Sequence, residues 1–470
     1  MILQQFFVPG IAHSSYLMGR GDACAIIDPE RHIQVYLDEA RALGMRITHI
    51  LETHLHADFV SGHMDLAAAT GAPIYVAESA ECAFEHVAVN EGDTISLNGL
   101  EIDVLDTPGH TPEHVSYVVR DTARGADPVA VFTGDTLFVG DVGRPDLFPG
   151  QAERLASALF DSLAKLMQLP DYCEVYPAHG AGSLCGRAMG DKRTSTIGYE
   201  RRYNPALQIA EREAFIHSLT HDMPAAPDHF ARCSDINRQG PTRVDDLGPL
   251  RPIAPRELAY WTMGEARLLL DVRDYAAFGG LHIHGAWHND LRGNFATFAG
   301  WMLPPYSEMM LVASDESEAH EARRQMQRVG LDKVTGFLQG GMRAWVQAGL
   351  PIEGVQQMSA ERLNDCLEGE KELVLLDVRS KGEYAATHIQ GTLHIPLPEL
   401  RTRFVELPRD LPIVALCSTG NRSSFAASLL LSHGFAPVMS LAGGMAAVAA
   451  GGFGPACPVC YTGPGPREAI

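Results

Sequence analysis

The sequence predicts a multidomain α/β protein, and three observations support this fold class. Short apolar runs alternate with turns and amphipathic helices from residue 1 to about residue 245. Two sequence repeats follow, separated by an offset of about 105 residues, which is the size of a small domain. The 470 residues are 46% hydrophobic and 20% charged, a composition typical of about two to four folded domains.

The composition also excludes several classes of function. A formal net charge of −21 repels phosphate backbones, so we expect no nucleic-acid partner. No apolar segment reaches the roughly 20 residues of a membrane span, and the first residues lack the pattern of a signal peptide. Nine scattered cysteines, an odd number in a large chain, argue against a disulfide framework. We therefore expect a cytoplasmic protein in which any important cysteine is catalytic or a ligand.

In the first region, four predicted strands end in a loop that carries a histidine or an aspartate. Strands are expected at 23–27, 47–51, 101–105, 115–119, 129–132 and 174–176, and helices at 31–43 and from about 63 to 71. The side chains that follow strand ends are His54, His110, Asp135 and His179. Because the ends of neighbouring strands bring ligands to one crevice, we expect these residues to form a single site.

One of these loops, residues 53–59, is unusually rich in metal-binding side chains. It places His54, His56 and Asp58 within five residues, directly after a predicted buried strand. A rigid strand gives such a loop the precision that a metal site needs. The next residue, Phe59, has no group that can coordinate a metal.

The second half contains a linker and two copies of one domain. Prolines 252 and 255, after the stretch 246–249, indicate the linker. The repeated motifs pair 268–273 with 374–379, 282–286 with 388–392, and 338–342 with 441–445. Each copy is expected to be a doubly wound parallel sheet, over residues 256–355 and 358–455. Residues 456–470 read as a loose tail, in which Cys457 and Cys460 are a weak metal or redox signal.

The first region, residues 1–245, resembles the metallo-β-lactamase fold in its glyoxalase-II-like branch. The matching segments are Thr53 to Asp58, Thr107 to Thr111, Thr133 to Phe138 and Tyr176 to His179. The resemblance implies an αββα sandwich with a metal at the edge of the sheets. The segment 233–241 is similar to the closing loop of the family.

Two activities compete within this branch, and Phe59 separates them. Two-metal thioester hydrolases carry a further histidine at that position, so a second metal would lose a ligand here. Two histidines and one carboxylate, His54, His110 and Asp135, suit one non-haem Fe(II) with open positions. The most similar members on this point are persulfide dioxygenases, which implies that His56, Asp58 and His179 support the ligands by hydrogen bonds.

The resemblance implies a low-molecular-weight thiol persulfide as substrate, with O₂ as oxidant and sulfite plus thiol as products. Arg144 is a candidate to bind an anionic carrier or sulfite through paired hydrogen bonds. A structural arginine paired with Asp146 is an equally good interpretation. Glutathione, coenzyme A and other carrier thiols all remain open.

Cys417 begins a second candidate site. A predicted strand at 413–416 precedes it, and a helix is expected from 423 to about 432. Backbone N–H groups and a helix N-terminus favour a thiolate and a bound anion at such a junction. The loop residues are Cys417, Ser418, Thr419, Gly420, Asn421 and Arg422. With the surrounding motifs they resemble the rhodanese family, which implies sulfur transfer through a Cys417 persulfide.

The equivalent loop of the first copy, residues 314–318, has no cysteine and contains three acidic residues. We therefore expect an inactive rhodanese-like domain followed by an active one. The whole chain resembles persulfide dioxygenase fusions that serve sulfide detoxification, which makes a homodimer or tetramer plausible. The alternatives are a di-zinc thioester hydrolase fused to sulfur-carrier domains and a non-catalytic sulfur-relay scaffold.

Overall fold

A computed structural model describes residues 1–187, 189–221, 223, 225–261, 267–369 and 372–451, and the backbone of 459–460. Cys457 and the side chain of Cys460 lie outside this part of the chain. The chain divides into two compact units, one of Met1–Gly248 with Arg324–Asp332 and one of Pro249–Arg323 with Lys333–Ile470. Among the described residues, no helix is both long and apolar enough to cross a membrane.

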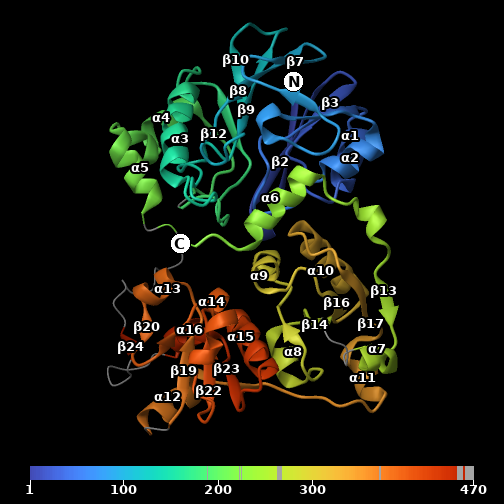
Figure 1. Cartoon of the computed structure of the whole chain (residues 1–470), viewed down its shortest axis with the longest axis vertical. Coiled ribbons are helices and arrows are strands. Elements are labelled where there is room, and N and C mark those ends of the chain that lie inside the picture. Colours follow the sequence, from blue (N-terminus) through green and yellow to red (C-terminus); the bar gives the residue numbers. More distant parts are fainter. Residues whose placement is uncertain are drawn as a thin grey trace. The chain divides into compact units, whose positions relative to one another are not determined.

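The first unit contains two six-stranded sheets (Figure 1). One sheet has the order β1-β2-β3-β4-β5-β6 and the other β12-β11-β10-β9-β8-β7. The strands of the first are β1 (Ile2–Val8), β2 (His13–Arg20), β3 (Ala23–Ile27), β4 (Arg46–Leu51), β5 (Ile74–Ala77) and β6 (Val87–Val89). Those of the second are β7 (Thr94–Leu97), β8 (Leu100–Asp106), β9 (Val115–Asp121), β10 (Pro128–Gly134), β11 (Glu174–Pro177) and β12 (Ser195–Thr196).

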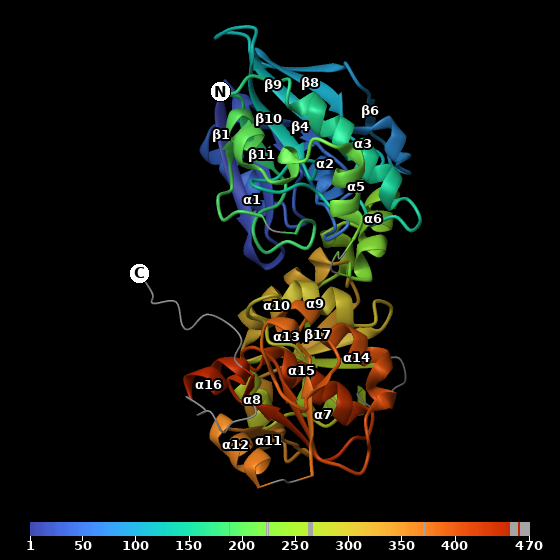
Figure 2. The same cartoon turned by 90° about the vertical axis from the view of Figure 1, so that its left-hand side faces the viewer.

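Three apolar clusters define four layers in this unit. Side chains of both sheets, among them Ile27 and Phe132, share one core, so the sheets pack face to face. Helices α1 (Gln34–Ala42) and α2 (His63–Thr70) cover the outer face of the first sheet, and α3 (Ala152–Leu166) and α5 (Arg212–Thr220) cover that of the second. Figure 1 shows this order of helix, sheet, sheet and helix, and Figure 2 views the same unit from the side on which α5 and α3 lie. The predicted αββα sandwich is therefore confirmed.

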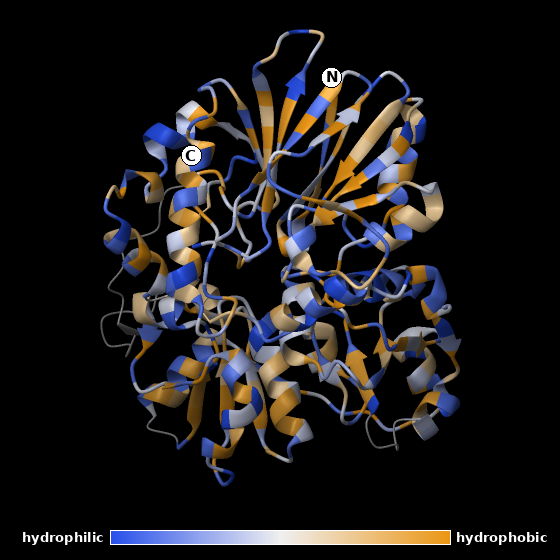
Figure 3. Cartoon of the chain, turned by 45° about the horizontal axis from the view of Figure 1, so that its top comes forward, coloured by the Kyte–Doolittle hydropathy of each residue, from blue (hydrophilic) through white to orange (hydrophobic). Residues whose placement is uncertain are grey.

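Hydropathy explains why these layers form. In Figure 3 apolar colour is concentrated on the strands, whereas the outer helices alternate apolar and polar residues. The two remaining helices of the unit are α4 (Ile197–Tyr203) and α6 (His229–Gln239). Helix α6 covers the segment that was predicted to be a closing loop, so that prediction is wrong.

The second unit contains two parallel five-stranded sheets of identical topology, β13-β17-β16-β14-β15 and β18-β23-β22-β19-β21. The first copy comprises β13 (Arg251–Ile253), α7 (Pro255–Trp261), β14 (Arg267–Asp271), α8 (Tyr275–Gly280), β15 (Trp287–His288), α9 (Phe295–Met302), β16 (Glu308–Val312), α10 (Glu316–Arg328), β17 (Val334–Leu338) and α11 (Gly341–Gln347). The predicted parallel sheets are confirmed in both copies.

The second copy repeats this order. It comprises β18 (Gln356–Met358), α12 (Ala360–Glu368), β19 (Val374–Asp377), α13 (Lys381–Ala386), β20 (His388–Ile389), β21 (Leu393–His394), α14 (Leu397–Arg403), β22 (Ile413–Leu416), α15 (Asn421–Ser432), β23 (Val438–Leu441), α16 (Gly444–Ala450) and β24 (Val459–Cys460). One buried ion pair recurs in both copies, as Asp271–Arg273 and Asp377–Arg379. The repeat thus extends from sequence to side-chain contacts.

Candidate metal centre and sulfur-transfer loop

Four strand ends bring three predicted ligands and the predicted supporting residue His179 to one edge of the first unit. The loop after β4 carries His54, the loop between β8 and β9 carries His110, and Asp135 and His179 follow β10 and β11. These side chains have relative exposures of 1% or less. The predicted convergence of distant strand ends is therefore what the structure shows.

His54, His110 and Asp135 form a cluster whose ligand atoms all lie within 4.8 Å of one another. Asp135 Oδ2 lies 3.3 Å from His110 Nε2 and 3.8 Å from His54 Nε2. None of these three buried atoms has a hydrogen-bond partner. Buried polar atoms without partners are costly, and a shared cation would satisfy all three. The donor set fits a metal ion held by two imidazoles and one carboxylate.

The other polar atoms of the triad are held by hydrogen bonds. His110 Nδ1 donates to the Arg144 carbonyl at 2.9 Å, and His54 Nδ1 lies 2.9 Å from Thr53 Oγ1. Asp135 Oδ1 lies 2.7 Å from His179 Nδ1. These contacts hold the two imidazole rings and the carboxylate in position. They leave the Nε2 atoms of His54 and His110 and the Oδ2 atom of Asp135 directed toward one another.

The protonation states of His54, His110 and Asp135 are those that metal binding requires. Burial and the neighbouring imidazoles hold the pKa of His54 well below its usual value, and burial also lowers the pKa of His110. Both rings are therefore neutral, the form that binds metals. Burial alone would raise the pKa of Asp135, but the charge of His179 and the hydrogen bond to it hold that pKa below its usual range.

His56 turns away from the triad. Its Nε2 lies 3.3 Å from Asp28 Oδ1 and 3.8 Å from Glu52 Oε2. Asp28 in turn accepts hydrogen bonds from the backbone N–H and the hydroxyl of Thr53, at 2.7 and 2.9 Å. His56 therefore belongs to a buried network behind the loop. Phe59, fully buried, packs against the rings of His56 and His13.

Asp58 and His179 lie on the other side of Asp135. The Nε2 of His179 is 2.8 Å from Asp58 Oδ2, while its Nδ1 contacts Asp135. The pKa of His179 lies well above its usual value because, although burial lowers it, both carboxylates raise it. His179 thus links Asp135 to Asp58, as a supporting residue would.

Arg144 is buried, with 1% relative exposure. Its Nε and Nη2 donate to both oxygens of Asp146, and its Nη1 donates to the Leu184 carbonyl. This geometry favours the structural interpretation over contact with a substrate. The contribution of Arg144 to the centre is its backbone carbonyl, which accepts from His110.

Three supporting residues escaped the sequence interpretation. Asp135 N–H donates to His114 Nε2 at 2.9 Å, and the buried thiol of Cys185 clusters with Asp58 and His179. Asn237, on α6, donates to the carbonyls of His56 and Phe59 and accepts from Ser61 N–H. The sequence held two signals for them, the spacing of His114 from His110 and the place of Asn237 within the segment 233–241.

Cys417 follows β22 and is buried, with 1% relative exposure. Gly420 N–H donates to its Sγ at 3.1 Å, and Ser423 Oγ lies 3.6 Å away. Helix α15 begins at Asn421, two residues earlier than predicted, so Asn421 and Arg422 form its first turn. Ser418 and Thr419 complete the loop. The carbonyls of Cys417 and Ser418 accept hydrogen bonds from the backbone N–H groups of Met445 and Ala446, in the first turn of α16. These bonds hold the loop in the conformation that directs the Gly420 N–H at the Cys417 sulfur.

Arg422 is held by Glu383 of α13. Both guanidinium Nη atoms lie 2.7 Å from its carboxylate oxygens, and Ser418 Oγ donates to the same group at 2.7 Å. Although burial raises it, these partners hold the pKa of Glu383 below its usual range. The positive charge beside Cys417 is therefore fixed in position.

The corresponding loop of the first copy is filled by its own acidic side chains. Ser314 N–H donates to the carboxylate of Glu318, and Glu318 N–H donates to Asp315 Oδ1 at 2.9 Å. Two backbone N–H groups of this loop are thus already bonded to its own carboxylates. A residue of this copy also contacts the cysteine loop, because a Cβ added at Gly420 would lie 3.0 Å from the ring of Tyr275.

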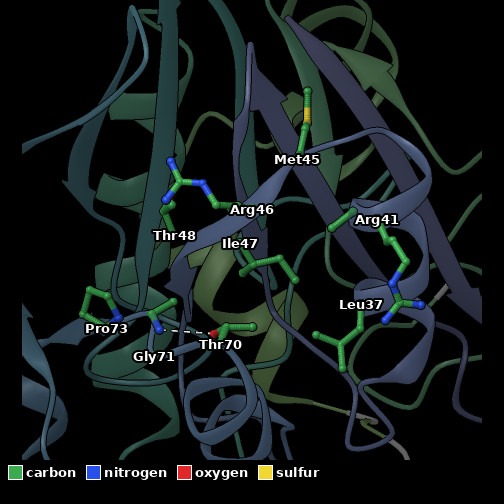
Figure 4. A pocket seen from close by; sticks show the side chains of 11 residues that line it. Leu37, Arg41, Met45, Arg46, Ile47, Thr48, Thr70, Gly71 and Pro73 are labelled. Carbon is green, nitrogen blue, oxygen red and sulfur yellow. Dashed lines mark hydrogen bonds between the residues drawn. The ribbon is translucent and has the colours of Figure 1, made fainter.

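A separate hollow of about 470 Å³ lies between α1, β4 and the end of α2 (Figure 4). Arg41, Arg46 and Thr70 are among its lining residues, and no predicted site residue reaches it. Nothing in its lining connects it to the metal centre.

Fold and site together define an αββα protein with a buried histidine–carboxylate cluster that fits a metal ion, followed by two parallel α/β domains. Residues 8–179 match the metallo-beta-lactamase superfamily, and residues 255–348 and 359–450 match the rhodanese-like domain. The chain belongs to the metallo-β-lactamase superfamily and carries two rhodanese-like domains.

Several relatives were found. A metallo-beta-lactamase structure from Staphylococcus aureus is 34% identical, covers 72% of this chain and 99% of its own, and has a TM-score of 0.65. A hydroxyacylglutathione hydrolase of Rhodospirillum rubrum is 38% identical over 33% of this chain and 57% of its own length. The mitochondrial persulfide dioxygenase ETHE1 of Bos taurus is 29% identical over 45% and 78%.

Proposed function

We propose that the chain is a persulfide dioxygenase with thiosulfate sulfurtransferase activity. It would oxidise a low-molecular-weight thiol persulfide with O₂ to sulfite and thiol, in cytoplasmic sulfide detoxification. One Fe(II) per chain would be held by His54, His110 and Asp135. The similarity to a persulfide dioxygenase supports this assignment.

One observation carries the proposal. Three buried, unpartnered atoms, two imidazole nitrogens and one carboxylate oxygen, face one another, while His56 is turned to Asp28. Two histidines and one carboxylate with open positions are the ligand set of non-haem ferrous oxygenases. Iron bound there supplies the redox chemistry by which O₂ oxidises a sulfur substrate.

The chain's own residues prepare this site for an anionic persulfide. His54 and His110 are kept neutral by burial, so the ligand set carries only the charge of Asp135. Surrounding residues exclude bulk water from the centre, since all three ligands are buried. The overall reaction is RSSH + O₂ + H₂O giving RSH and sulfurous acid, in which the outer sulfur loses four electrons and O₂ gains them.

Cys417 would carry the second reaction. Its persulfide transfers the outer sulfur to sulfite, the Cys–S bond to that sulfur breaks, and thiosulfate and the Cys417 thiolate are released. The Gly420 N–H directed at Sγ and the fixed charge of Arg422 stabilise the leaving thiolate. Ser418, Thr419 and Asn421 shape the loop that receives the anion. The reverse reaction, in which the Cys417 thiolate takes the outer sulfur of thiosulfate and releases sulfite, would use the same residues.

Oxygen consumption tests the first reaction. The Cys417→Ser variant, loaded anaerobically with Fe(II), receives glutathione persulfide and then O₂. We expect O₂ uptake with equimolar sulfite and glutathione, because this variant cannot convert sulfite to thiosulfate. Iron-loaded protein that consumes no O₂ would exclude the dioxygenase assignment.

A di-zinc thioester hydrolase remains the second candidate, favoured by the 38% identity to a hydroxyacylglutathione hydrolase. If this second function holds, zinc-loaded protein must hydrolyse an acyl-glutathione. Comparing iron-loaded and zinc-loaded samples on both substrates distinguishes the two functions.

A further inference from the structure

The end of helix α10 belongs to the first unit, although the sequence repeat assigns it to the first rhodanese-like copy. Residues 324–332, which are the last residues of that helix and the turn after it, lie in the same compact unit as residues 1–248. Gln327, Val329 and Leu331 of this segment have relative exposures of 2%, 0% and 0%. The copy that lacks the cysteine thus contributes a buried segment to the unit that contains the triad.

The carbonyl groups around the end of α10 accept hydrogen bonds from other parts of the first unit. Carbonyls at a helix end have no partner inside their own helix. The Gln327 carbonyl accepts from Arg31 Nη1 at 2.9 Å, and the Val329 carbonyl accepts from Arg232 Nη2 at 2.9 Å. These guanidinium groups also place positive charge at the negative end of the helix dipole. The segment is therefore held by directed bonds and not by apolar packing alone.

One residue of the segment is bonded to the end of the metal loop, as we call residues 53–59. Val60 donates its N–H to the Arg328 carbonyl at 2.6 Å. The Arg328 guanidinium donates to both carboxylate oxygens of Glu30, at 3.0 and 3.3 Å, and the backbone of Glu30 is bridged to that of Ser61. Arg328 therefore restrains the end of the metal loop in two ways, through its own carbonyl and through Glu30.

Gly330 brings the segment against α6, the helix that also holds the metal loop. Its φ is +71°, and a Cβ added there would lie 2.8 Å from Ile236 of α6 and 3.5 Å from Val60. Asn237 of α6 donates to two carbonyls of the metal loop. The segment, the helix and the loop thus pack as one group, and a displacement of the segment would disturb the other two.

We propose that the first rhodanese-like copy positions the metal loop through residues 324–332, with Arg328 as the main positioning residue. Its bonds to Val60 and Glu30 restrain the backbone that follows the loop. A restrained loop keeps His54 aligned with the other two ligands before a metal binds. The proposal rests on metal binding by the triad, as the proposed function does, but not on the reaction that the metal catalyses.

Two pairs of matched variants test this role. Gly330→Asn and Gly349→Asn replace glycines with nearly equal φ, +71° and +70°, so the backbone cost of asparagine is similar at the two positions. An added Cβ meets Ile236 at residue 330, whereas nothing lies within 4 Å of it at residue 349. Arg328→Met and Arg343→Met compare the bonded arginine with an exposed arginine of α11.

Hydrogen–deuterium exchange of the metal-free, full-length chain is the first measurement, because it requires neither metal nor activity. We expect the peptide of residues 53–62 to exchange about tenfold faster in Gly330→Asn and Arg328→Met, and at the wild-type rate in both controls. Slow exchange in β9 shows that the unit stays folded. If β9 also exchanges faster, the milder pair Gly330→Ala and Gly349→Ala replaces the asparagine pair. Wild-type exchange of residues 53–62 in the test variants would overturn the proposal.

A Co²⁺ titration of the same proteins, followed by the visible absorption of the bound ion, links the loop to the triad. We expect the dissociation constant to rise about tenfold in Gly330→Asn and Arg328→Met and to stay unchanged in the controls. Arg328→Lys keeps a charge opposite Glu30 and should recover most of the affinity. Faster exchange with unchanged affinity would overturn the positioning role. A wild type that binds no Co²⁺ would instead contradict the proposed function, and the exchange rates would then decide whether the segment holds the loop.

Discussion

Asn237 connects helix α6 to the loop that carries His54, His56 and Asp58. Its side chain is 1% exposed and makes three hydrogen bonds to that loop, at 2.8, 2.8 and 2.9 Å. A loop has many backbone polar groups that water normally satisfies, and here one buried amide satisfies three of them. Asn237 thereby holds the backbone that carries His54, one of the three proposed metal ligands.

Replacing Asn237 by alanine would leave two carbonyls and one N–H buried without partners. We expect a loss of about 3 kcal/mol in the free energy of unfolding, measured by urea denaturation of the metal-free chain. Asn294→Ala, exposed at the start of α9 and without a side-chain cap hydrogen bond, is the control and should change stability by less than about 0.5 kcal/mol. A loss below about 1 kcal/mol for Asn237→Ala would mean that water replaces the amide.

Glu383 provides a residue-level test of the cysteine loop through pH. Arg422 and Ser418 hold its pKa below the usual value, so the folded state favours the ionised carboxylate. The stabilisation is therefore complete above the unfolded pKa of about 4.5 and is lost as the pH falls through the lower folded pKa.

Glu383→Gln should accordingly destabilise the protein near neutral pH by about 1 kcal/mol, a modest value because the pair is partly exposed. The difference from the wild type should shrink as the pH falls below about 4. Thermal unfolding midpoints at several pH values provide the measurement. A difference that is independent of pH would show that the charge of Glu383 contributes nothing.

At the scale of single residues, the sequence indicates which side chains carry chemistry but not where they point. His54, His56 and Asp58 stand within five residues and look equivalent in the sequence. In the structure they contribute to three different clusters, because the loop bends at residues 53–54 and 57–59 and therefore does not keep these side chains on one side. The position of Cys185 could not be predicted either, since only the fold brings residues 58, 179 and 185 together.

At the scale of elements, strands were predicted best. Apolar runs before His54, Asp135 and His179 correspond to β4, β10 and β11, because buried strands are short and nearly continuous in hydrophobicity. Helix α6 was missed because its sequence is polar and ends in Gly240-Pro241, a typical loop signal. Its polar side chains form hydrogen bonds instead: Asn237 to the loop of residues 53–59, and Arg232 to the segment 324–332.

The turn between β22 and α15 depends on one glycine. Gly420 has a φ of +115°, and an added Cβ would lie 3.0 Å from Tyr275. Gly420→Ala should therefore cost about 1–3 kcal/mol and move the N–H away from Sγ. We expect thiosulfate sulfurtransferase activity to fall while O₂ uptake persists. Gly382→Ala, on α13 with open space around it, is the control and should retain both activities.

At the scale of the whole molecule, the chain is expected to divide two reactions between its two units. His110→Ala removes a ligand of the triad and should reduce O₂ uptake by more than about a hundredfold, leaving sulfur transfer intact. Cys417→Ser should have the opposite effect. Oxygen electrode traces and thiosulfate assays on the two variants provide the comparison. Loss of both activities in either variant would show that the reactions are not separable.

The carboxylate of Glu318, bonded to Ser314 N–H in the first repeat, has a consequence for how this domain can evolve. Ser314→Cys would put a thiol at the position that corresponds to Cys417 in the second copy. The Glu318 carboxylate would still occupy the loop in which a substrate anion would bind. We therefore expect that a sulfurtransferase site in this copy would need at least two substitutions, one that introduces the thiol and one that removes the Glu318 carboxylate from the loop.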